Sequence, residues 1–264
     1  MLLLLLCAAL AQQHSQTSGA DDLRAGVALD LAGRGAEARK HFASAIHAAA
    51  QPAAKLDAQR AMAISYAFDG DCKGAEKYDG AAYDFLIQAQ NFSSAGEVAN
   101  ELGRICLDAG AIDSAYNWYR RGHDAGLTPE NLSDGQKDLW NFRWVHARAR
   151  IGARRGKADE AAKYVAAAKS ILDKHTNPDQ EVYLPYLTGY VAFYVGDYSR
   201  ALEQLHEANQ TDPFIQCLIA QSYEKLGDLE NARTWYGKAA GTGAHSVPAA
   251  FARPFSVRKL QQIH

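Results

Sequence analysis

Two stripes of side chains in the second half of the chain have the spacing and the chemistry of a binding surface. Arg143, Arg150 and Arg154 recur at intervals of seven and four residues, so on an α-helix they share one face. A second stripe of the same kind consists of Tyr183, Tyr186, Tyr190 and Tyr194. Arginine holds carboxylates through two parallel hydrogen bonds, and tyrosine stacks on apolar groups. The stripes therefore suit an acidic or C-terminal peptide segment, unless the arginines are a solvated face and the tyrosines belong to the core.

No motif in the chain points to catalysis. A P-loop, a glycine-rich dinucleotide fingerprint, a His-Glu-x-x-His pair and a Gly-x-Ser-x-Gly elbow are all absent from the sequence. The nine histidines are scattered, and no two stand three or four residues apart, the spacing that puts two metal ligands on one helical face. We therefore expect a protein without enzymatic activity, without a metal and without a cofactor.

Composition places the chain among helical proteins. The 264 residues are long enough for one or two ordinary domains, and 48% of them are hydrophobic, as in globular proteins. Alanine is abundant and the seven prolines lie between helical stretches, which favours an all-α fold. The net charge of −2 provides no basic field for nucleic acid or anionic lipid.

The elements that would position the two stripes are repeated helix pairs. Toward the C-terminus a glycine is followed at fixed intervals by an alanine, a bulky residue and another alanine. This pattern occurs at Gly196, Ala201, Leu205 and Ala208, and again at Gly227, Ala232, Tyr236 and Ala239. Similar but more degenerate patterns occur nearer the N-terminus. In all, about six units are anchored by Ala38, Ala75, Ala115, Ala161, Ala201 and Ala232. Repetition of this kind is the signature of stacked helix pairs.

The physical role of each position in a unit follows from helix chemistry. The glycine ends the first helix in a left-handed conformation, and the aspartate after it, as in Gly196-Asp197, caps the second helix. The anchor alanine permits a close helix crossing, and the bulky residue four positions later fills the joint on the same face. Because one helix pair cannot bury its apolar stripe alone, the units must stack, and we expect one continuous array over residues 19–246.

These residues resemble the tetratricopeptide repeat. In the sixth unit, Gln216, Ile219-Ala220 and Tyr223 occupy the family's first-helix positions, although the family's leading tryptophan is absent. The resemblance implies a right-handed superhelical solenoid of antiparallel helix pairs, with a concave groove lined by the first helices where a peptide binds. On this assignment the groove residues are Asn100, Arg104, Arg143, His146, Arg150, Arg154, Tyr183, Tyr186, Tyr190 and Tyr194.

Two cysteines are candidates for a disulfide. Cys72 begins the second helix of unit two, and Cys106 lies in the first helix of unit three, which should stack directly on it. An exported protein meets oxidising conditions in which such a bridge forms. The alternative is a pair of small buried thiols, which behave as apolar core residues.

The two ends of the chain differ from the repeats. Residues 1–11 are apolar and end in Ala9-Leu10-Ala11, which fits a small-x-small cleavage site. We expect a signal peptide and a periplasmic or extracellular protein. Because no lysine or arginine precedes the apolar run, the alternative is the trimmed end of a longer membrane anchor. Residues 247–264 are expected to cap the open end of the array.

These patterns predict an exported, non-enzymatic scaffold that binds a protein or peptide in its concave groove. The alternative function is that of a sensor or regulatory module belonging to a membrane-anchored signalling protein with a truncated N-terminus. In either case the expected partner is a protein or peptide, nucleic acid is not expected, and membrane contact is limited to an uncleaved N-terminal anchor.

Overall fold

The computed structural model describes residues 19–263, and the predicted signal peptide at residues 1–11 lies outside this part of the chain. The described residues are helical and include no β-strand, which confirms the all-α prediction. No helix among them has both the length and the apolar character that crossing a membrane requires.

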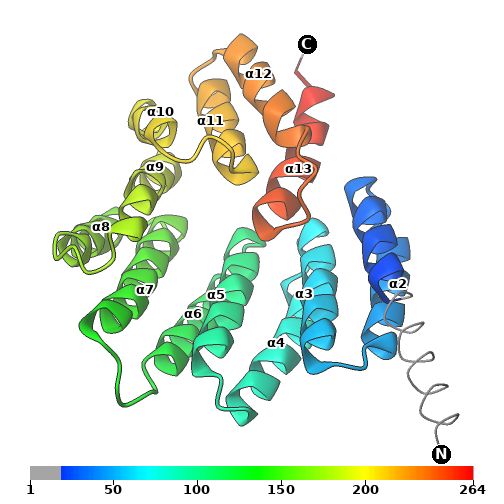
Figure 1. Ribbon diagram of the computed structural model, residues 1–264. Coiled ribbons are helices and arrows are strands. Elements are labelled where there is room, and N and C mark those ends of the chain that lie inside the picture. The colour runs from blue at the N-terminus through cyan, green and yellow to red at the C-terminus, as the bar shows by residue number, and fades with distance from the viewer. Residues whose placement is uncertain (1–18, 264) are drawn as a thin grey trace, which may run out of the picture.

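The helices follow one another through short connections. A helical stretch over residues 19–31 precedes the elements labelled in Figure 1. These elements are α2 (Gly35–Ala48), α3 (Pro52–Phe68), α4 (Cys72–Gln88), α5 (Phe92–Asp108), α6 (Ile112–Gly126), α7 (Asp134–Arg154), α8 (Ala158–Leu172), the 3-10 helix η1 (Pro178–Tyr183), α9 (Leu184–Val195), α10 (Tyr198–Glu207), α11 (Pro213–Lys225), α12 (Leu229–Ala240) and α13 (Val247–Leu260).

The helices pack as successive pairs. The pairs are α3 with α4, α5 with α6, α7 with α8, α9 with α10, and α11 with α12. The helix over residues 19–31 lies against α2, where His41 bonds to Asp22 at 2.7 Å. Each pair contacts the next, for example through α4 and α5 or through α10 and α11. Figure 1 shows α3, α5, α7, α9 and α11 around a common interior, with α2, α8, α10 and α12 further out.

The joint inside each pair has the predicted chemistry. Six glycines adopt φ values between 69° and 91°, a left-handed conformation in which a side chain would be strained. They are Gly33, Gly70, Gly110, Gly156, Gly196 and Gly227. In three of these joints an aspartate after the glycine accepts a hydrogen bond from a backbone N–H three residues later, and these caps are Asp71, Asp197 and Asp228. Local sequence therefore sets where each first helix ends and the second begins.

The crossing inside each pair is close because its residues are small. All six anchor alanines are 0% exposed. On the facing helix a glycine receives the bulky residue: a Cβ at Gly103 would lie 2.9 Å from Tyr119, and one at Gly189 would lie 2.7 Å from Leu205. A side chain at either glycine would force the helices apart, so the bulky residue and the glycine depend on each other.

Unit two departs from this pattern, because a carboxyl occupies the position that holds a bulky residue in other units. Asp79 is 1% exposed, and neither of its oxygens has a hydrogen-bond partner among residues 19–263. Burial raises the pKa of Asp79 well above its usual value, the negative charge of Glu101 raises it further, and Arg60 opposes the shift. The carboxyl is therefore held in its neutral form over a wider pH range than in an unfolded chain.

The two predicted cysteines are joined. A disulfide links Cys72 at the start of α4 to Cys106 in α5, with their Cα atoms 4.8 Å apart. The bridge therefore connects unit two to unit three, in agreement with the packing of α4 on α5. Cys217 in α11 is a buried free thiol, and burial raises its pKa to about 11.

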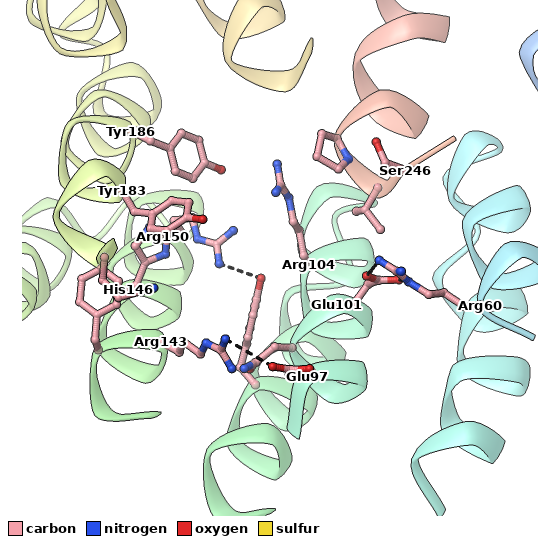
Figure 2. A pocket seen from close by; sticks show the side chains of 16 residues that line it. Arg60, Glu97, Glu101, Arg104, Arg143, His146, Arg150, Tyr183, Tyr186 and Ser246 are labelled. Atoms are coloured by element: carbon pink, nitrogen blue, oxygen red, sulfur yellow. Dashed lines mark hydrogen bonds and ion pairs between the residues drawn. The ribbon is translucent and has the colours of Figure 1, made fainter. Parts of the chain in front are cut away.

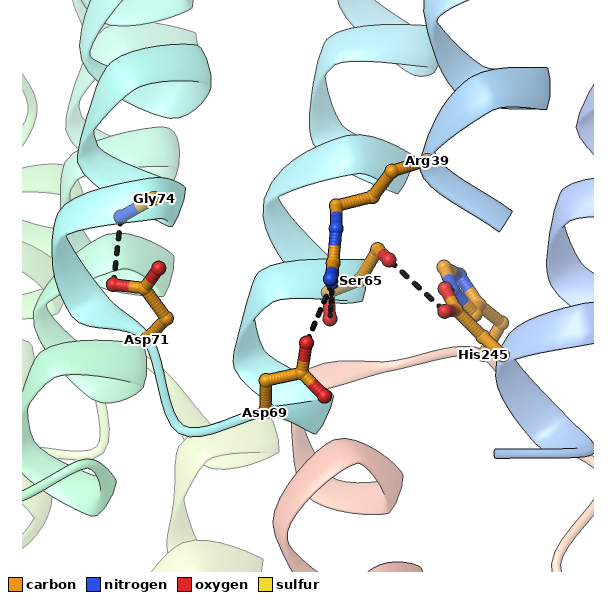
Figure 3. Close-up of polar contacts among 7 residues, drawn as sticks. Arg39, Ser65, Asp69, Asp71, Gly74 and His245 are labelled. Atoms are coloured by element: carbon orange, nitrogen blue, oxygen red, sulfur yellow. Dashed lines mark hydrogen bonds and ion pairs between the residues drawn. The ribbon is translucent and has the colours of Figure 1, made fainter. Parts of the chain in front are cut away.

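The C-terminal segment does more than cover α12. Helix α13 packs on α11 and α12 and also returns to α3 and α5, so the two ends of the array meet. His245 bonds to the buried carboxylate of Asp30 at 2.8 Å, and Ser65 donates to the other oxygen of that carboxylate at 2.9 Å (Figure 3). Arg253 donates to the carbonyl of Leu31. These contacts close the helices around the common interior.

The anchor alanines give a first prediction. Ala201→Leu and Ala232→Leu should each lower the free energy of unfolding by about 1–3 kcal/mol, because added methylene groups force a close crossing open. Urea unfolding measures the change. Ala166→Leu, at an exposed position inside α8, is the matched control and should stay within about 0.5 kcal/mol of the parent. Anchor variants that unfold like this control would show that the crossings are not where we place them.

Asp79 gives a second prediction, which concerns pH. The folded chain holds the Asp79 proton more tightly than the unfolded chain, so the free energy of unfolding should fall as pH rises above about 4. Asp79→Asn has no titrating group at this position. The free energy of unfolding of the variant, relative to that of the parent, should therefore increase by up to about 1.4 kcal/mol for each pH unit above about 4. Urea unfolding from pH 4 to pH 8 measures the difference. A constant difference across the series would contradict a buried neutral carboxyl.

Candidate functional site

A cavity of about 630 Å³ lies in the common interior. Its walls come from α3, α5, α6, α7, η1, α9 and the beginning of α13 (Figure 2). The lining residues are Arg60, Glu97, Asn100, Glu101, Arg104, Tyr119, Phe142, Arg143, His146, Arg150, Gln180, Tyr183, Tyr186, Ser246, Val247 and Pro248. The volume is in the range of pockets that hold small ligands or one end of a larger one, about 300–1,000 Å³.

Most of the residues predicted for the groove line this cavity. The structure brings together Asn100, Arg104, Arg143, His146, Arg150, Tyr183 and Tyr186. The two predicted stripes therefore contribute to one site, the arginines from α7 and the tyrosines from η1 and α9. Tyr183 is the most open of them, at 49% exposed, and stands at the end of η1.

The other three predicted residues lie outside the cavity lining. Tyr190 is 0% exposed and belongs to the core, with its ring 6.4 Å from Phe214 of α11. Tyr194 packs on Tyr190, their ring centroids 4.5 Å apart, and Arg154 lies over the Tyr194 ring at 4.9 Å. Tyr190 is therefore a core residue and not part of the groove surface, because this turn of α9 packs on α11, while Arg154 and Tyr194 are half-buried next to it.

Two of the four arginines in the lining are paired with glutamates. Arg60 donates from Nε and Nη2 to both oxygens of Glu101, at 2.7 and 2.6 Å. Arg143 lies 3.6 Å from a carboxylate oxygen of Glu97. Both pairs are drawn in Figure 2. These carboxylates balance Arg60 and Arg143. Arg104 has the carboxyl of Asp108 at 3.6 Å, and Arg150 has no carboxylate within 4 Å among the described residues.

Arg104 and Arg150 form the inner wall together with three other polar side chains, Asn100, His146 and Tyr186. Arg150 is 6% exposed and donates to the hydroxyl of Tyr119 at 2.9 Å, but its Nε has no hydrogen-bond partner among the described residues. The Nε and Nη2 of Arg104 also lack a partner. So do Nδ2 of Asn100, Nε2 of His146 and the hydroxyl of Tyr186. Buried groups without partners cost stability, and a ligand that pairs with them offsets that cost.

A single buried carboxyl stands behind this wall. Asp108 is 3.6 Å from Nε of Arg104 and 4.0 Å from Nη1 of Arg154, both beyond hydrogen-bond distance. Burial raises the pKa of Asp108, while the positive charges of Arg104, Arg150 and Arg154 act to lower it. The negative charge of Asp212 also acts on Arg104, so two carboxyls face three arginines and the inner wall keeps an excess of positive charge.

His146 adds no charge to the wall. Burial and the positive charges of Arg150 and Arg104 hold the pKa of His146 well below its usual range. The centroid of its ring lies 5.8 Å from that of Tyr186, and burial raises the pKa of Tyr186. At neutral pH the wall therefore combines permanent cations with neutral hydrogen-bonding groups.

Several lining residues were missed by the sequence analysis. Arg60, Glu97 and Glu101 lie on first helices, where the same helical spacing could have identified them had charged pairs been traced into unit two. Ser246, Val247 and Pro248 had no such signal, because only the return of the C-terminal segment to the N-terminal helices brings them to the cavity.

No protein-family model matches the chain, and no curated protein matches it. What the fold and the site define is a class: an all-α protein of packed helix pairs with an arginine-rich cavity between them.

The protonation state of His146 gives a third prediction. The imidazole signals of His146 in an NMR titration should remain those of the neutral ring from pH 8 down to about 6, while free histidine in the same tube begins to protonate. Arg104→Gln removes one of the charges that disfavour the imidazolium and should raise the pKa of His146. A midpoint equal to that of free histidine, or one that Arg104→Gln does not move, would contradict the burial and charge described here.

Proposed function

We propose that this chain is a scaffold of the tetratricopeptide class, a right-handed solenoid of helix pairs. In this proposal it binds an acidic or C-terminal segment of a protein or peptide in its central cavity and carries out no chemistry of its own. Support for the class comes from the six glycine-ended helix pairs with fully buried anchor alanines. Helix pairs of this kind stack so that their first helices share one surface, which serves for binding.

The observation that carries the proposal is the pair of arginines on the inner wall. Arg104 and Arg150 are not bound to a carboxylate at hydrogen-bond distance, whereas Arg60 in the same cavity is. A charged group that is shielded from water and lacks a counterpart binds one more strongly than an exposed group does. An acidic side chain or a chain terminus supplies that counterpart.

The polar contacts in the lining favour binding over catalysis. The hydrogen bonds and ion pairs among the lining residues join arginines to glutamates and Arg150 to Tyr119. Nucleophilic catalysis needs a nucleophile bonded to a base, and none of these contacts has that form.

The disulfide supports the proposal that the protein works outside the cytoplasm. Bridges such as that between Cys72 and Cys106 form and persist in oxidising compartments. This agrees with the signal peptide predicted for residues 1–11 and with a periplasmic or extracellular location.

A fourth prediction tests peptide binding. On an array of peptides, the mature chain should bind acidic sequences or peptides with a free C-terminus. Binding should be lost when aspartate and glutamate are replaced by asparagine and glutamine and the C-terminus is amidated. Arg104→Gln should weaken the selected interactions about tenfold, since a hydrogen-bonded charge contact is lost. Arg120→Gln, on an exposed side chain of α6, is the matched control and should bind like the parent. Peptides that bind equally well in charged and neutral forms would rule the proposal out.

A further inference from the structure

The arginines of the cavity differ in one detail that identifies the group they recognise. In Arg60, Nε and Nη2 form the side-on fork of the guanidinium, and Glu101 occupies it with both oxygens at 2.7 and 2.6 Å. In Arg104, on the helix that carries Glu101, the same two nitrogens have no partner among the described residues. This fork matches the two oxygens of a carboxylate. The cavity therefore contains one filled carboxylate fork and one unfilled fork of the same kind.

The surroundings of the Arg104 fork complete a set of donors. The nearest carboxylate oxygen, on Asp108, is 3.6 Å from Nε of Arg104, so the fork is close to this carboxyl without being bonded to it. Asn100 Nδ2 and the Tyr186 hydroxyl are unpartnered in the same wall. All of these atoms are shielded from water, and the residues that carry them line the cavity. A carboxylate accepts up to about four hydrogen bonds, so one carboxylate can pair with all of these donors.

Charge limits the ligand to one acidic group. The positive charge of the inner wall is on Arg104 and Arg150, and Asp108 lies 3.6 Å from Arg104. Glu97 and Glu101, on the same helix as Arg104, are paired with Arg143 and Arg60 and repel a second negative group in the cavity. A phosphate dianion would bring two negative charges near these carboxylates, whereas a monocarboxylate brings one.

The rest of the lining is suited to a compact apolar body. Phe142, Tyr183 and Val247 line the cavity beside the polar wall. Figure 2 shows Tyr183 and Tyr186 on one side of the space and Ser246, which precedes α13, on the other. Because α13 returns to α3 and α5, it walls this side, and the volume of about 630 Å³ suits a small ring rather than a long extended chain.

We propose that the inner wall is a carboxylate subsite centred on Arg104, with Arg150, Asn100 and Tyr186, and that its ligand is an aromatic monocarboxylic acid. The carboxylate occupies the Arg104 fork and the ring lies between Phe142 and Tyr183. Such a group is offered by a free aromatic acid or by a peptide that ends in an aromatic residue. This inference rests on the proposed function in that both use the same cavity, but it names a narrower ligand.

Isothermal titration calorimetry of the mature chain tests the subsite with defined probes. Benzoate and phenylacetate are the free acids, benzamide and phenylacetamide are their neutral counterparts, and inorganic phosphate is the alternative anion. Gly-Gly-Phe with a free or an amidated end is the peptide source. The acids should bind and their amides should not. If only the free-ended peptide binds, the ligand is a chain end, and the free-acid source is overturned.

Variants separate recognition from folding. Arg104→Gln should weaken benzoate binding about tenfold or more, and Arg104→Lys should also weaken it, because lysine keeps the charge but has no fork. Tyr186→Phe removes only the hydroxyl and should weaken binding about threefold to tenfold, even if the arginine variants prove unstable. Arg120→Gln on α6 is the control and should bind like the parent, with circular dichroism verifying the fold of every variant.

The outcomes are distinguishable. Binding of acidic peptides without any binding of aromatic acids or of Gly-Gly-Phe would overturn the subsite and leave the proposed function intact. Phosphate that binds more tightly than benzoate would overturn the carboxylate assignment. Aromatic acids that bind equally well to the parent and to both Arg104→Gln and Tyr186→Phe would show that the ligand sits elsewhere.

Discussion

The close crossing of two helices at a small residue is the constraint on which the rest of this structure depends. At each joint a left-handed glycine ends the first helix, and a fully buried alanine lets the second helix lie against it. In units three and five the bulky side chain one turn later fits a glycine on the first helix, as Tyr119 fits Gly103. The apolar side chains are buried within and between the helix pairs. The face that the first helices share can therefore carry charged side chains.

That shared face has an unusual balance of charge. Arg60 is exposed and Arg143 is half-buried, and each is paired with a glutamate, Glu101 or Glu97. Arg104 and Arg150 lie deeper, where burying a charge is costly. Tyrosine rings soften this cost, since Arg104 lies 6.0 Å from the Tyr186 ring and Arg150 lies 5.3 Å from the Tyr119 ring. The unfavourable free energy of burying these polar groups is therefore concentrated at the inner wall of the cavity.

The sequence predicted what short-range chemistry determines. Helix ends and crossings follow from residues a few positions apart, so the capping glycines, the anchor alanines and the pairing of Cys72 with Cys106 were accessible. Helical spacing also placed Arg104 and Arg150 on the inner face. The same spacing misassigned Tyr190, since a stripe shows which residues share a face and not which neighbour that face meets. Ser246 was beyond prediction because a contact between distant parts of the chain places it.

The bond between His245 and Asp30 joins residues 215 positions apart in the chain. Every helix pair, by contrast, is built from residues that are near one another in sequence and can form as soon as both helices exist. Assembly therefore has an inherent order: local hairpins first, then their stacking, and last the closure that costs the most chain entropy. Until the segment that carries His245 and α13 docks, Asp30 lacks its His245 partner and α3 lacks its contact with α13. The cavity is consequently a property of the completed chain, and none of its helix pairs contains it alone.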